Sequence, residues 1–190
     1  MKLSILILSI PTRFAMMQAL YTKILNQIGN EDIEILCLID NKKRSIGDKR
    51  NDLVVAARGE YLTFIDDDDD VCDNYISELV IGIKSKSDVI VFNETASFNG
   101  ENSFTVRPGI EYENEHARKV NGRWVDIRRK PWHWCLWKSS IAKTERVPDM
   151  NNGEDELWCR RLLTKIKTQY RINKILRIYR FDKSISDHGN

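Results

Sequence analysis

The sequence predicts an α/β fold in which a mostly parallel central sheet is flanked by helices. Short apolar runs alternate with helix-like segments through the first half of the chain. Such alternation is typical of βαβ units, whose consecutive strands lie parallel. Three apolar runs also end in polar residues, which begin at Pro11, Asp40 and Asp66. Because ligands bind beyond the carboxyl ends of strands in such sheets, these residues outline a crevice the size of a nucleotide.

The individual elements follow from apolar spacing and from the residues that end each run. We expect buried strands at residues 3–10, 33–39, 61–65 and 88–93, and helices at residues 14–28, 48–58 and 74–84. Gly29 and Gly59 end two of these helices. The second half is less regular, and there we expect a hairpin or loop excursion at residues 95–109, a tryptophan-rich segment at 123–138, a helix at 154–167 and a final strand at 174–180.

Length and composition indicate an ordinary soluble globular protein with one domain, residues 1–190. No segment approaches the roughly 18 to 20 apolar residues that span a bilayer. The four cysteines (Cys37, Cys72, Cys135 and Cys159) are widely spaced and form no C-x-x-C pair. This spacing argues against a zinc site or a disulfide framework and favours reduced thiols in a cytoplasmic protein.

Charge is distributed unevenly along the chain. Residues 1–106 carry 17 acidic and 11 basic side chains, whereas residues 107–190 carry 11 acidic and 19 basic ones. A basic half can attract a polyanion or an anionic membrane surface, although solubility alone also explains many basic surfaces.

Five consecutive aspartates, Asp66 to Asp70, follow the apolar run at residues 61–65. Carboxylates this close repel one another, so the run needs solvent, protonation or a cation to neutralise it. Oxygen ligands favour Mg²⁺ or Mn²⁺, ions that usually also hold substrate phosphates. A solvated acidic turn is the alternative explanation of the run.

The stretch at residues 47–71 resembles the core of family 2 glycosyltransferases with the GT-A (Rossmann-like) fold. That family typically shows an Arg-Asn pair, a helix, Ala-x-Gly-Glu-Tyr and then an apolar strand that runs into an Asp-x-Asp motif. The matching segments here are RN at 50–51, ARGEY at 57–61 and DDDD at 66–69, with further matches at 4–11, 153–162 and 179–186. The resemblance covers most of the chain. It implies a metal-dependent, inverting transfer of a sugar from a nucleotide diphosphate, with a UDP-sugar expected, to a hydroxyl acceptor.

The resemblance also assigns roles on the donor side, which would be residues 1–106. Asp66 and Asp68 take the Asp-x-Asp positions, Asp69 is the alternative register, and Asp70 is expected in a solvent-exposed turn or at a helix cap. The donor-binding residues implied are Pro11, Arg13, Asp40, Arg50, Asp66 and Asp67. The ligands implied for Mn²⁺ or Mg²⁺ are Asp68, Asp66, Asp69 and His188. A surface salt bridge is the alternative role of Arg50, and a terminal tail without a ligand is the alternative for His188.

On the acceptor side, residues 107–190, Asp155 matches the family's general base, and Glu154 is expected to hold an acceptor hydroxyl. The alternative is that these acidic residues only complement a helix dipole. Trp132, His133 and Trp134 are expected to contact the acceptor. Core packing also explains tryptophans, and we expect at least two in this region to be buried.

Two other functions remain open from sequence. A nucleotidyltransferase shares the sheet architecture and the acidic metal site, but the first strand is followed by Pro11-Thr12-Arg13 and no glycine-rich loop. A non-enzymatic cation- or nucleic-acid-binding module would use the basic half. For a glycosyltransferase, the acceptors considered are a glycan, a lipid-linked glycan or a modified nucleic-acid base, with DNA as the minority hypothesis.

Overall fold

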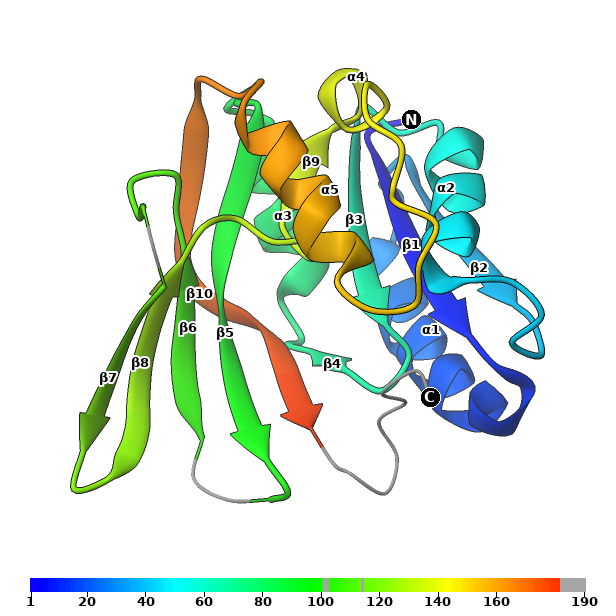
Figure 1. Cartoon of the computed structure of the whole chain (residues 1–190). Coiled ribbons are helices and arrows are strands. Elements are labelled where there is room, and N and C mark those ends of the chain that lie inside the picture. The colour runs from blue at the N-terminus through cyan, green and yellow to red at the C-terminus, as the bar shows by residue number, and fades with distance from the viewer. Residues whose placement is uncertain (101–102, 114, 182–190) are drawn as a thin grey trace.

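The computed structural model describes residues 1–100, 103–113 and 115–181 (Figure 1). Its helices are η1 (Pro11–Arg13), α1 (Phe14–Ile28), α2 (Ile46–Ala56), α3 (Tyr75–Ile83), α4 (Ser139–Ala142) and α5 (Glu154–Leu163). Its strands are β1 (Leu3–Ser9), β2 (Ile33–Ile39), β3 (Tyr61–Asp66), β4 (Asp70–Val71), β5 (Val89–Phe98), β6 (Phe104–Pro108), β7 (His116–Val120), β8 (Arg123–Arg129), β9 (Leu136–Lys138) and β10 (Gln169–Phe181). Among these described helices, none is long and apolar enough to cross a membrane.

A single sheet runs through both halves of the chain in the order β2-β1-β3-β9-β5-β6-β8-β7, with β10 paired to β5 and to β4. Strand β1 pairs parallel with β2 and β3, as the βαβ pattern predicts. Strand β9 runs antiparallel to both β3 and β5 and joins the two halves. The α/β fold is therefore confirmed. The sheet is mixed instead of mostly parallel, because its second half combines the parallel pairs β5–β10 and β6–β8 with the antiparallel pairs of β9, β5–β6, β7–β8 and β4–β10.

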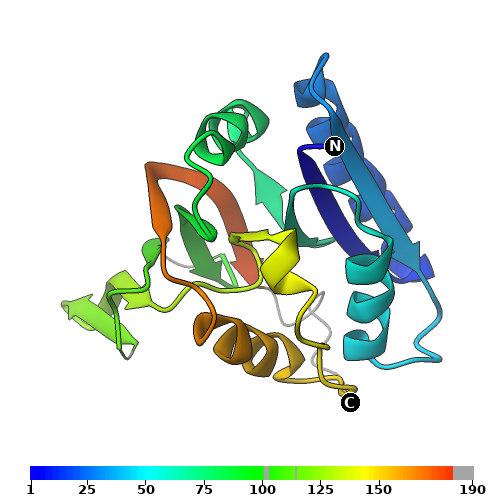
Figure 2. The ribbon, with the colours of Figure 1, turned by 90° about the horizontal axis from the view of Figure 1, so that it is seen from above.

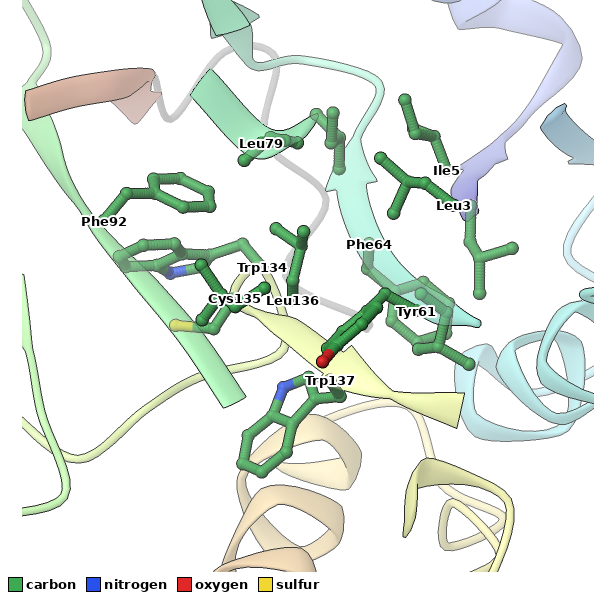
Figure 3. Close-up of a cluster of buried hydrophobic side chains, with 14 of the residues drawn as sticks. Leu3, Ile5, Tyr61, Phe64, Leu79, Phe92, Trp134, Cys135, Leu136 and Trp137 are labelled. Atoms are coloured by element: carbon green, nitrogen blue, oxygen red, sulfur yellow. The ribbon is translucent and has the colours of Figure 1, made fainter. Parts of the chain in front are cut away.

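Helices cover both faces of this sheet (Figure 2). Helices α1 and α3 pack together on one side, and α2 and α5 lie on the other. The buried core contains three tryptophans, Trp134, Trp137 and Trp158, and Figure 3 shows the first two among the apolar side chains of the central strands. The expectation of at least two buried tryptophans is confirmed.

The polar strand ends meet at one edge of the sheet, as predicted. Turn η1 follows β1, Asp40 follows β2, and Asp66 ends β3. The Asp40 amide donates to the Ser9 carbonyl at 3.3 Å, and Leu8 is the register partner of Asp66. Parallel pairing thus brings three segments that are distant in sequence to a common rim.

The predicted bounds agree best where apolar periodicity is strong. Helix α1 and strand β2 have the predicted limits. Helix α2 begins earlier than predicted, at Ile46, because the Ser45 hydroxyl accepts from the Asp48 amide and caps it. Helix α5 is shorter than predicted, and the excursion at residues 95–109 is the end of β5 paired with β6. The β7–β8 hairpin was not predicted, because β7 is exposed along its whole length and has no apolar pattern.

Asn51 links α2 to the segment that precedes α5, and it yields a stability prediction. Its side-chain amide donates to the carbonyls of Gly47 and Val147 at 3.0 and 2.9 Å, and its oxygen accepts from the Val147 amide at 2.8 Å. We expect Asn51→Ala to lower the free energy of unfolding by about 2 kcal/mol, because it removes these bonds and leaves backbone groups unpaired.

Urea denaturation measures the change. The exposed Asn26→Ala control should differ from wild type by less than about 0.5 kcal/mol. Equal effects of the two substitutions would contradict the assignment.

Candidate active site

The five aspartates alternate in burial along the chain. Asp67 and Asp69 are buried, whereas Asp66, Asp68 and Asp70 are partly exposed. Residues 67 and 68 form a turn, closed by a hydrogen bond from the Asp69 amide to the Asp66 carbonyl at 3.1 Å, so side chains of the run point in different directions. The alternation therefore divides the run into inward-facing and outward-facing carboxylates.

The first inward carboxylate, Asp67, is held from the end of β1. The Ser9 hydroxyl donates to its Oδ2 at 2.6 Å, and Arg13 Nη1 donates to its Oδ1. Arg13 Nη1 also lies 3.3 Å from Asp68 Oδ2. The structure thus gives Arg13, expected at the donor, a contact with both an inward and an outward aspartate, while Pro11 is exposed at the start of η1.

The second inward carboxylate, Asp69, is held by Arg177 of β10. Arg177 Nε donates to Asp69 Oδ2 at 2.9 Å, and Nη2 makes a second bond to the same oxygen. Arg177 Nη1 donates to Glu94 of β5. Burial opposes the charge of Arg177, but the surrounding carboxylates outweigh it and raise its pKa. Because the Asp69 side chain is only 1% exposed, a hydrated cation carrying a diphosphate reaches Asp68 more readily.

Asp66 lies where three basic side chains from different parts of the chain converge. Its carboxylate is 3.3 Å from Arg50 Nη2, 3.3 Å from Arg177 Nη2 and 3.2 Å from His133 Nε2. Burial raises the pKa of Asp66, but His133, Arg50 and Arg177 together hold that pKa well below its usual range. Asp66 is therefore ionised, and its side chain is still 31% exposed.

Arg50 is buried, so the alternative of a surface salt bridge is wrong. Its Nε donates to Glu154 Oε1 at 3.1 Å, and its guanidinium lies 4.7 Å from the centre of the Phe64 ring. Glu154, expected to hold an acceptor hydroxyl, is itself buried and engaged in this pair. The Arg50–Glu154 pair joins α2 to the start of α5.

The candidate base Asp155 lies in the first turn of α5, after Gly153, whose φ of 76° suits glycine. The Trp132 indole donates to Asp155 Oδ2 at 3.0 Å, and His133 Nδ1 lies 2.7 Å from the same oxygen. Burial raises the pKa of Asp155, but His133 and Arg50 outweigh it and hold that pKa well below its usual range. His133 therefore lies between Asp66 and Asp155 and contacts both.

The three residues expected to contact the acceptor lie in different surroundings. Trp134 is 2% exposed and packs against Phe92 at 5.2 Å between ring centres, so its place is in the core (Figure 3). His133 is buried between the two carboxylates. Trp132 is partly exposed, and the Arg129 guanidinium lies 3.7 Å over its ring. Of the three, Trp132 is the one placed at the surface beside Asp155.

Asp40 presents a carboxylate at the end of β2. Lys49 Nζ and the Lys42 amide each lie 3.0 Å from its Oδ1. Burial raises the pKa of Asp40, but these donors outweigh it and lower that pKa. Within the described residues Asp40 Oδ2 is buried without a hydrogen-bond partner, and its nearest cation is Arg44, whose Nε lies 3.9 Å away.

Whether the aspartates suit a divalent cation can be judged from their arrangement. Residues 1–100, 103–113 and 115–181 contain no group of three His, Cys, Asp or Glu side chains placed to hold a metal, and His188 lies outside these ranges. Magnesium, however, commonly takes one or two carboxylates and completes its shell with substrate phosphates and water. Burial, and after it the neighbouring Asp66, raise the pKa of Asp68, while Arg13 opposes this effect. Asp66 and Asp68 therefore fit a cation that arrives with a diphosphate.

Sequence reasoning missed three residues of this site: Ser9, Glu94 and Arg177. Ser9 is a common residue at a strand end and has no distinctive spacing. Arg177 interrupts the apolar run at residues 175–179, and Glu94 directly follows the buried run at 89–93. A charged residue inside a buried strand is a signal of a buried ion pair, and the parallel register of β5 and β10 places these two opposite each other.

Comparison with known proteins identifies the family and the fold of this chain. The model of the glycosyl transferase family 2 matches residues 21–142, and the chain belongs to this family. The chain is similar in fold to S. aureus TarS 1–349 crystallised with UDP-GlcNAc, with 15% identity and a TM-score of 0.68 over 99% of this chain and 60% of that one. The structure of TarS 1–349 with UDP gives a TM-score of 0.65, 15% identity, and coverage of 96% and 61%. The chain thus spans about 60% of the length of these structures.

No curated protein matches it significantly. The predicted family and GT-A fold are confirmed.

The Arg177 network yields a second prediction. Arg177→Met should lower the free energy of unfolding by about 3 to 5 kcal/mol, because Asp69 and Glu94 would stay buried without their cation. Adding Asp69→Asn to Arg177→Met should recover part of this loss by removing one of the buried charges. Urea denaturation at neutral pH measures the free energy of unfolding of wild type, Arg177→Met and the double variant. The exposed Arg180→Met serves as the control and should cost less than about 0.5 kcal/mol. A loss for Arg177→Met as small as that of the control would contradict the network.

Proposed function

We propose that this chain is a metal-dependent, inverting glycosyltransferase that moves a sugar from a UDP-sugar to a hydroxyl acceptor, with Asp155 as general base. The observation that carries the proposal is the position of His133. Its two ring nitrogens lie 3.2 Å from Asp66 and 2.7 Å from Asp155, so the Asp-x-Asp carboxylate and the base carboxylate share one side chain. Family membership favours sugar transfer over a nucleotidyltransferase or a non-enzymatic binding module.

The donor would bind along the rim formed by the ends of β1, β2 and β3. TarS, which shares this fold, has been crystallised with UDP and with UDP-GlcNAc, which makes UDP-GlcNAc the first donor to test. Asp40, whose side chain is 17% exposed at this rim, would accept from a ribose or base group. Asp66 and Asp68 would hold Mn²⁺ or Mg²⁺, which, when bound, stabilises the charge that grows on the departing diphosphate. Arg13, beside Asp68, adds positive charge there.

On the acceptor side, the hydroxyl oxygen attacks the anomeric carbon as the bond from that carbon to the diphosphate oxygen breaks. The bonding electron pair leaves with the nucleoside diphosphate, and Asp155 accepts the hydroxyl proton. The low pKa of Asp155 keeps it ionised and able to accept. The proton becomes acidic only as its oxygen bonds to carbon, so transfer to a weak base is feasible in the transition state. The Trp132 indole bond and the His133 contact fix the orientation of the carboxylate.

This division assigns residues 1–106 of a single domain to the donor and residues 107–190 to the acceptor. The acceptor classes are a glycan, a lipid-linked glycan or a modified nucleic-acid base. The four cysteines are free thiols, which supports a cytoplasmic site of action.

The general-base role is tested with Asp155→Asn. We expect this variant to lose at least about 100-fold in kcat with UDP-GlcNAc, because proton transfer contributes about that much, while it still binds UDP and Mn²⁺. Transfer is followed by UDP release in the presence of an acceptor, and donor binding by thermal shift. Glu156→Gln, in the same helical turn but partly exposed and paired with Arg160, is the matched control and should keep full activity.

Two outcomes would contradict the proposal. Full activity of Asp155→Asn would contradict its role as general base. The absence of a thermal shift with UDP-GlcNAc and every other UDP-sugar in the presence of Mn²⁺ would contradict the use of a UDP-sugar donor.

A further inference from the structure

Three arginines line one face of the sheet at its outer strands β6, β8 and β7, and none of them belongs to the site described above. They are Arg107 on β6, Arg128 on β8 and Arg118 on β7, and we call them the arginine row. Arg107 is the register partner of Arg128, and Arg118 is the register partner of Asp126. Arg107 Nε and Arg128 Nε donate to the two oxygens of Asp126 at 2.7 and 3.1 Å. Because register partners point to the same side of a sheet, all three arginines share one face.

The strand register places this face on the side of the sheet that holds the candidate active site. Val89 of β5 is paired with Trp137, and Trp137 packs against Trp158 of α5 at 6.0 Å. Alternation along β5 puts Thr95 on the same side as Val89, and Thr95 is paired with Thr105, which is two residues from Arg107. The arginine row therefore lies on the sheet face that α5, the helix of Asp155, also covers.

Asp66 lies on that same face. Leu62 of β3 is paired with Trp137, and alternation places Phe64 and Asp66 on the side of Leu62. Phe64 packs against Trp158 at 5.9 Å, which confirms this direction. A chain lying on this face can extend from the rim beside Asp155 across the arginine row.

The charge of the arginine row is only partly neutralised within the sheet, because one carboxylate, that of Asp126, binds two of its arginines. Like charges directly opposite each other on paired strands are destabilising, and Asp126 is the one acid among the residues at 116–130, against six Lys and Arg side chains. Charges on an outermost strand prevent unwanted pairing, but Arg107 and Arg128 lie on β6 and β8, which have neighbours on both sides. Protection of a sheet edge therefore does not account for them.

We infer that the arginine row is a docking surface for the acceptor and that this acceptor is an anionic glycan. The inference rests on the proposed glycosyl transfer and adds the chemical class of the acceptor. Planar guanidinium groups bind phosphate and carboxylate groups in a bidentate manner. A row that spans three strands offers such contacts at intervals, which suits a chain with repeated negative charges.

The nearby aromatic rings favour a glycan over a nucleic acid. Proteins that bind single-stranded nucleic acids stack bases on exposed aromatic faces. Here the Lys119 ammonium lies 3.9 Å over the Trp124 ring, and the Arg129 guanidinium lies 3.7 Å over the Trp132 ring. The two tryptophans closest to the arginine row in sequence are thus each covered on one face by a cation. The positive charge is retained, whereas the stacking surface is reduced.

The test measures binding of the wild-type chain to two anionic glycans, polygalacturonate and heparin, at low and moderate salt. We expect binding that weakens as salt rises, and no binding to neutral dextran. Arg118→Glu, at an exposed position of β7, should weaken binding about tenfold, and Arg118→Glu with Arg128→Gln should weaken it further while Arg107 still holds Asp126. Lys84→Glu makes the same charge change at the end of α3, on the opposite side of the sheet, and should leave binding unchanged.

Three results would overturn the inference. They are equal binding by Arg118→Glu and wild type, tighter binding to single-stranded DNA than to either glycan, and tighter binding to phosphatidylglycerol vesicles than to either glycan. Thermal shift with UDP and Mn²⁺ reports on the donor side separately. If the wild-type chain shows no thermal shift with UDP and Mn²⁺ but binds the glycans in an Arg118-dependent manner, the proposed function is contradicted. The docking surface would still stand in that case.

Discussion

The buried guanidinium of Arg177 determines which aspartates of the run face solvent. Five adjacent carboxylates have no intrinsic register, because each is chemically identical to the next. Arg177 binds Asp69 and Ser9 and Arg13 bind Asp67. Asp66 and Asp68 contact the same two arginines at 3.3 Å but keep more of their side chains exposed. The chemistry proposed for this protein follows from that division.

The same arrangement connects the two halves of the chain. Arg50 reaches from α2 to Asp66 and Glu154, and His133 reaches from the segment before β9 to Asp66 and Asp155. The carboxylate proposed to face the donor and the carboxylate proposed to act as base are thus positioned by shared cations. Such sharing holds the two carboxylates at a defined separation, which suits a reaction in which both substrates must be aligned.

Much of the first half of the fold could be predicted from sequence, and the reasons are physical. Helix α1 and strand β2 have strong apolar periods with clear end signals, and their bounds are as predicted. Strand β7 has no buried residue and therefore no periodic signal. Arg177 was missed because its partners Asp69 and Glu94 are distant in sequence, and only the sheet register brings them together. Glu154 matched a family motif, but its burial against Arg50 depends on tertiary packing.

In the proposed site, Asp66 and Asp68 face the cation, while Asp67 remains bonded to Arg13 and Asp69 to Arg177. Crystals grown with UDP and Mn²⁺ test it most directly, since the anomalous signal of manganese locates the ion. We predict a single peak at about 2.2 Å from an Asp68 oxygen, with Asp69 still bonded to Arg177. A peak ligated by Asp69 or Asp67, with Arg177 or Arg13 displaced, would contradict it.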